Sequence, residues 1–116
     1  GFHRMVLRRA KAGELDVVGS VAREPAVGWT GLFTVRWGKA KRRGEELIVM
    51  RCAVFRLRLE WAVPTAQAVA LRELIAAGRA GSPAGWWKTW PRTDAARRTL
   101  WLLSGMGAVA VASTNR

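Results

Sequence analysis

The sequence predicts a single α+β domain, in which a three-stranded antiparallel meander is followed by a helix, a Trp-rich loop and a second helix packed on one sheet face. Three observations predict it: a period-two apolar pattern in the first half, a helical stripe directly after Pro64, and a 116-residue chain that is half hydrophobic. We expect a basic N-terminal arm over residues 1–13, the domain over 14–105, and a C-terminal tail or short strand over 106–116.

The first two strands are predicted where apolar residues occupy every second position, over residues 15–21 and 33–37. Glu24, Pro25 and Gly28 separate the two runs, which is typical of a turn. In the second run Phe33, Val35 and Trp37 share one face, and we assign Trp37 to the core.

The third strand is predicted from about Glu46 to Val63. Its first part is apolar on both faces, so we expect a bulge or register change near Arg51. Its second part alternates: Arg56, Arg58 and Glu60 point outward, and the opposite residues point to the core, namely Ala53, Phe55, Leu57, Leu59, Trp61 and Val63.

Two helices follow the predicted sheet. Pro64 ends the last strand, and Thr65 is expected to cap a helix that runs to about Ala77 and stops at Gly78. Its core-facing stripe is Ala68, Leu71, Leu74 and Ile75, and its other face carries Gln67 and Arg72. Thr93 is expected to cap the second helix, with Asp94 favourable to its dipole and Gly105 at its end.

The charge balance points to an anionic partner. Lys and Arg number 20 against 8 Asp and Glu, a formal net charge of +12. The lone Cys52 permits no internal disulfide, so we expect a reducing, cytoplasmic setting.

A basic hairpin is the first candidate site. Gly38 and Gly44 flank four cations, which is typical of an exposed loop. Further arginines on the adjoining strands extend this charge, giving the candidate phosphate contacts Arg36, Lys39, Lys41, Arg42, Arg43, Arg51, Arg56 and Arg58. The simplest alternative is a solvated strand face in a chain rich in Arg for compositional reasons.

The second candidate site is a Trp-rich segment, in which aromatic rings alternate with cations as in single-strand stacking platforms. Its residues are Trp86, Trp87, Lys88, Trp90 and Arg92. The same composition suits a membrane-interface anchor or a loop that completes the core, and core completion is the strongest of the three readings because a small domain rarely exposes three indoles.

Catalytic chemistry finds little support in the sequence. The one His lies at the very start, the one Cys has no base beside it, and no spacing matches a metal site, so we expect no enzyme activity, no metal and no cofactor. A membrane span is not expected either, because the longest apolar stretch, residues 100–112, is shorter than the ~20 residues that a spanning helix needs.

The leading prediction is a non-enzymatic nucleic-acid-binding domain that contacts phosphates through the basic hairpin and the Arg-bearing sheet face. The alternative is a structural or assembly protein of a phage particle or ribonucleoprotein, whose basic face docks on an acidic protein. A third prediction is peripheral binding to an anionic membrane surface.

Overall fold

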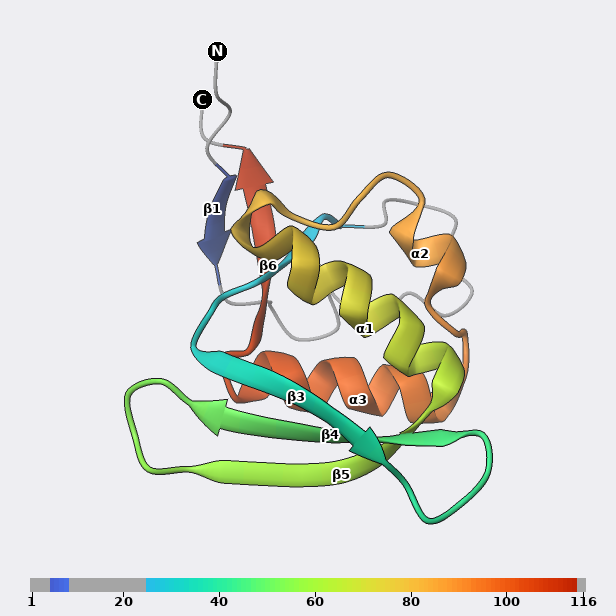
Figure 1. The fold of residues 1–116 in the computed structure, drawn as a ribbon. Coiled ribbons are helices and arrows are strands. Elements are labelled where there is room, and N and C mark those ends of the chain that lie inside the picture. Colours follow the sequence, from blue (N-terminus) through green and yellow to red (C-terminus); the bar gives the residue numbers. More distant parts are fainter. Residues whose placement is uncertain (1–4, 9–24, 115–116) are drawn as a thin grey trace.

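The computed structural model describes residues 5–8 and 25–114, which form two small sheets and a layer of helices (Figure 1). The larger sheet is an antiparallel meander of β3 (Phe33–Lys39), β4 (Glu45–Cys52) and β5 (Arg58–Pro64), with β4 in the centre. After it come α1 (Thr65–Ala77), the 3-10 turn η1 (Gly78–Ala80), α2 (Trp86–Thr89) and α3 (Asp94–Gly105). The predicted fold class is therefore confirmed.

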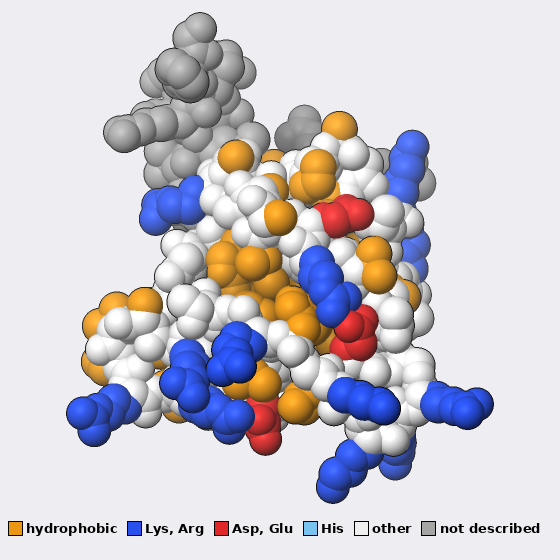
Figure 2. All heavy atoms as spheres, viewed as in Figure 1, with side chains coloured by type: hydrophobic (Ala, Val, Ile, Leu, Met, Phe, Trp, Pro, Cys, Tyr) orange, Lys and Arg blue, Asp and Glu red, His pale blue; other side chains and the backbone are white. Residues whose placement is uncertain are grey.

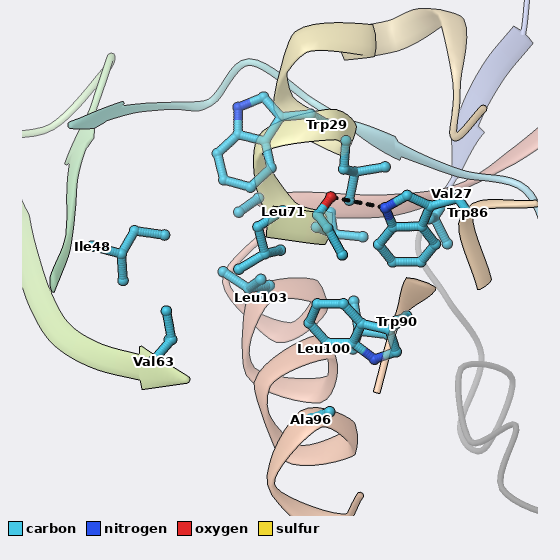
Figure 3. Packing of buried hydrophobic residues seen from close by; sticks show 14 of the residues in the cluster. Val27, Trp29, Ile48, Val63, Leu71, Trp86, Trp90, Ala96, Leu100 and Leu103 are labelled. Carbon is cyan, nitrogen blue, oxygen red and sulfur yellow. Dashed lines mark hydrogen bonds between the residues drawn. The ribbon is translucent and has the colours of Figure 1, made fainter. Parts of the chain in front are cut away.

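The core lies between the meander and the helices. Figure 3 shows Ile48 and Val63 of the sheet facing Leu71 of α1 and Leu103 of α3, and all four side chains are fully buried. The helical stripe predicted for α1 is confirmed, since Ala68, Leu71 and Leu74 are buried and Ile75 packs against them. One face of the sheet is thus covered by helices, and the other faces solvent.

The single long strand predicted over residues 46–63 is wrong, because this segment forms the separate strands β4 and β5. Residues 53–57 form the turn between them, in which the Cys52 amide donates to the Leu57 carbonyl at 2.9 Å. The expected irregularity near Arg51 is in fact a chain reversal, and the pairing brings Arg51 opposite Arg58. The second half keeps its predicted alternation, with Val63 buried and Leu59 and Trp61 packed against the core.

A second sheet lies behind α1 and has the order β1-β6-β2. Its strands are β1 (Met5–Arg8), β2 (Val27–Trp29) and β6 (Val109–Thr114). The turn expected around Gly28 is wrong, because Gly28 is buried in β2 opposite Ala110. The strand that pairs with β2 is β6, some eighty residues further along the chain, and no local sequence pattern reveals such a pairing. The strand predicted over residues 15–21 lies outside the described residues.

Two expectations about the first helix are wrong. Thr65 is the first helical residue rather than a cap, and the preceding Pro64 makes no side-chain cap. Gln67, expected on the polar face, is buried, and its Oε1 accepts a hydrogen bond from the Thr99 hydroxyl at 2.8 Å. The cap at Thr93 is confirmed, because its hydroxyl oxygen accepts from the Ala96 amide at 3.1 Å.

Candidate nucleic-acid interface

The solvent face of the meander is defined by its register. Residues alternate across the sheet, so the inward positions of β4, Ile48 and Met50, are buried and the outward Arg51 is exposed. Arg51 pairs with Thr34 on one side and Arg58 on the other, and Arg36 lies one outward position further along β3. Three arginines from three strands therefore share this face.

The β3–β4 connection adds four more cations at one end of the sheet. Lys39 ends β3, and Lys41, Arg42 and Arg43 follow in an exposed loop that Gly44 closes at a φ of 76°. That loop is tied to the start of α1 because the Thr65 amide donates to the Gly44 carbonyl at 2.8 Å. We call Lys39, Lys41, Arg42 and Arg43 the basic hairpin.

Among the described residues, few carboxylates neutralise this surface. Glu60 pairs with Arg58 at 2.9 Å. Glu46 receives two hydrogen bonds from Arg72 of α1, one of them at 3.0 Å. Within the described part of the chain, no ion pair engages the remaining seven cations of the site, namely Arg36, Lys39, Lys41, Arg42, Arg43, Arg51 and Arg56. All seven are exposed, and Figure 2 shows blue side chains spread over the meander.

Arg72 ties the rim of the sheet to α1. Its guanidinium carbon lies 4.4 Å from the centre of the Trp37 ring while its nitrogens bind the Glu46 carboxylate. The hydrogen bonds from Arg72 hold the pKa of Glu46 below its ordinary value and raise that of Arg72. Trp37 and Trp61, assigned to the core from the sequence, point inward but are only partly buried at its margin.

The apolar residues of the turn between β4 and β5 are exposed, contrary to the prediction. Ala53, Phe55 and Leu57 were expected to face the core, yet all three are exposed because the chain leaves the sheet at Cys52. Val54 is exposed as well. Arg56 lies in the same turn, so it extends from the end of the sheet opposite the basic hairpin and is not on the strand face as predicted.

The Trp-rich segment is part of the core, which corrects its assignment to the interface. Trp86, Trp87 and Trp90 are 1, 8 and 5% exposed. Trp86 and Trp90 stack with ring centres 5.3 Å apart, and Trp87 meets Trp86 edge-on at 5.0 Å. The indole nitrogens of Trp86 and Trp87 donate to the carbonyls of Ala70 and Pro25 at 2.8 and 2.7 Å. Rings buried in this way have no exposed face on which a base could stack. The structure confirms the reading that this segment completes the core.

The two cations of that segment do not join the basic surface. Lys88 lies on α2, which Figure 1 shows on the far side of α1 from the meander. Arg92 is exposed but already has an interaction partner within the chain. We therefore limit the candidate interface to the eight cations from Arg36 to Arg58.

Over residues 5–8 and 25–114, no group of His, Cys, Asp and Glu is placed to hold a metal ion. Across the same residues, no helix is both long and apolar enough to cross a membrane. No family model, curated protein or solved structure matches the chain.

Proposed function

We propose that this protein is a nucleic-acid-binding domain whose contact surface is the solvent face of the meander together with the basic hairpin. One observation supports it most: seven exposed cations without an ion pair among the described residues gather within 21 positions of sequence, on one sheet and the two turns that connect its strands. A folded domain gains nothing in stability from such a cluster, since like charges repel, and a polyphosphate supplies the missing counter-charge.

The dimensions of the sheet suit a strand of phosphates. Seven residue steps separate Glu45 from Cys52 along β4, which is roughly 23 Å at about 3.3 Å per step. One strand of a duplex advances about 3.4 Å along the helix axis per phosphate, so a sheet of this length spans several phosphates. Six of the eight cations are arginines, which bind phosphate through two parallel hydrogen bonds.

A salt titration with mixed-sequence oligonucleotides tests the proposal. We expect tight binding at low salt and a linear fall of log affinity with log salt, and we expect affinity to rise with oligonucleotide length until the strand spans the sheet. Affinity that is absent, or that is independent of salt, contradicts the proposal.

The site itself is tested by reversing two hairpin charges, Arg42→Glu with Arg43→Glu. For a single strand the salt slope should fall by about 1.4 and affinity at 0.1 M salt by roughly 25-fold, because each lost phosphate contact carries a slope of about 0.7. The matched control is Arg79→Glu with Lys88→Glu, which changes net charge equally on η1 and α2. Equal losses in the two variants would show that net charge, and not this surface, drives binding.

The other two predictions, an assembly protein with a basic docking face and a peripheral binder of anionic membrane, stay predictions. The same charge variants test these two predictions, because an acidic protein or an anionic vesicle can replace the oligonucleotide in the titration.

A further inference from the structure

The β4–β5 turn, residues 53–57, differs from every other described loop in the chemistry it exposes. Phe55 is 72% exposed, and its neighbours Val54 and Leu57 are exposed too. Small soluble domains seldom gather large apolar side chains on one exposed turn unless that turn meets a partner.

The turn is held in place by its backbone. At its base the Cys52 amide donates to the Leu57 carbonyl at 2.9 Å and the Ala53 amide donates to Leu32 at 2.8 Å. At its tip the Leu57 amide donates to the Phe55 carbonyl at 2.8 Å, which closes a tight bend around Arg56. Phe55 is therefore presented on a hydrogen-bonded frame, and binding does not have to order a loose loop.

Cations lie within this turn and at its base. Arg56 lies inside the turn, and Arg51 and Arg58, the latter paired with Glu60, face one another where the strands enter it. Figure 2 shows the apolar side chains at the end of the meander with blue side chains beside them. An aromatic ring beside arginines is the arrangement with which proteins stack a base and bind its flanking phosphates.

We infer that Phe55 stacks on an unpaired base of a single-stranded nucleic acid, while the arginines around the turn hold the phosphates on either side of it. This inference rests on the proposed function and specifies its substrate. A bilayer is less suited to the same surface, because the basic hairpin and the turn point in opposite directions from the two ends of one sheet (Figure 1). A flat membrane reached by the turn would leave the hairpin unused, whereas a strand lying along the sheet meets both.

Single strands are favoured over duplexes by the size of the effects. One base stacked on an aromatic ring is worth roughly five- to 150-fold in affinity, and unstacking a duplex step costs a comparable factor. A single phenylalanine therefore has little net gain to offer from opening a duplex. An already unpaired base lets the stacking contribute in full.

The experiment compares Phe55→Ala with Trp101→Ala in the full chain, using a mixed-sequence 12-nucleotide single strand and a 12-base-pair duplex. Trp101 is the matched control, since it is 71% exposed and lies on α3. We expect Phe55→Ala to weaken single-strand binding about fivefold or more at every salt concentration with an unchanged salt slope, because stacking involves no counterion. Trp101→Ala should have no effect. Phe55→Trp should retain affinity and Phe55→Leu should not, which separates stacking from apolar contact.

Two outcomes overturn the inference. If the wild-type chain shows salt-dependent binding that Phe55→Ala leaves unchanged, Phe55 does not stack and the proposed phosphate surface stands alone. If Phe55→Ala abolishes binding to phosphatidylserine vesicles that the wild type binds more tightly than the oligonucleotide, the turn meets lipid instead. Absence of any salt-dependent oligonucleotide binding by the wild type is a separate result, because it overturns the proposed function itself. Unchanged thermal unfolding of each variant shows that the fold is retained.

Discussion

Two segments of this chain look alike in sequence and take opposite places in the structure. Residues 36–58 and residues 86–92 both combine aromatic rings with Lys and Arg. In the first the cations are exposed on a sheet and its turns, and in the second the rings are buried under α1. An aromatic ring beside a cation is thus compatible with a surface or a core, and the surrounding elements decide which one forms.

The cause of the difference is what each segment can pack against. The sheet has one covered face, so a period of two directs every second side chain of β3, β4 and β5 to solvent. The short helix α2 has no extended surface of its own. Its two indoles, and that of Trp90 directly after it, are buried by packing onto one another and onto neighbouring segments such as the α1 backbone. The sheet consequently exposes its cations, and the segment around α2 buries its indoles.

The largest expected effect is on stability and comes from a substitution in the buried Trp-rich segment. Trp86→Ala should lower the free energy of unfolding by about 3–5 kcal/mol, because it removes a fully buried indole, its hydrogen bond to Ala70 and its stacking on Trp90. Urea unfolding measures this loss, with Trp101→Ala as an exposed control that should change it by less than about 0.5 kcal/mol. A stable Trp86→Ala protein with impaired nucleic-acid binding would place the segment on the functional surface after all.

A smaller effect of opposite sign is expected on the exposed side. Arg51→Glu should raise the free energy of unfolding by about 0.2–1 kcal/mol, because it replaces a like-charge cross-strand pair with an attractive one opposite Arg58. The same substitution should weaken oligonucleotide binding. Arg36→Glu is the control, since it faces Val49 and should weaken binding without the gain in stability. A loss of stability in Arg51→Glu would mean that Arg51 supports the fold and is not displayed for a partner.

The smallest effect concerns the rim where α1 meets the sheet. The pKa of Glu46 lies below its ordinary value in the folded state, so its pairing with Arg72 stabilises the protein above the unfolded-state pKa and is lost as the pH falls through the folded-state pKa. Glu46→Gln should therefore unfold slightly more easily than the wild type at neutral pH, and the two should converge in acid. Thermal unfolding at a series of pH values measures the difference. A difference in unfolding temperature between the two proteins that stays unchanged in acid would show that the effect comes from packing and not from the ion pair.

How far the sequence could predict this molecule differs between elements. Local periodicity predicts the inward faces of residues 33–37 and 59–63 and the stripe of α1, and residue type predicts the cap at Thr93. All of these are found. The turn at residues 53–57 was missed because its apolar and charged residues continue the strand alternation without a Gly or Pro to end it. The strand β2 was missed because its partner β6 is distant in sequence.

The candidate site divides in the same way. The basic hairpin could be predicted, since two glycines and four cations suit only an exposed loop. The exposure of Phe55 could not, because an apolar residue at an inward strand position is normally buried, and only the chain reversal after Cys52 turns it outward.

The position of β6 has a consequence for synthesis on the ribosome. This strand is the last described element of the chain, yet it lies in the centre of its sheet, and Ala108, Val109 and Val111 are core residues. During translation the surface of β2 that pairs with β6 therefore stays uncovered until β6 has left the exit tunnel. The domain should complete its cooperative fold only once β6 has emerged, so a ribosome stalled shortly before β6 would hold a chain open to chaperones and proteases.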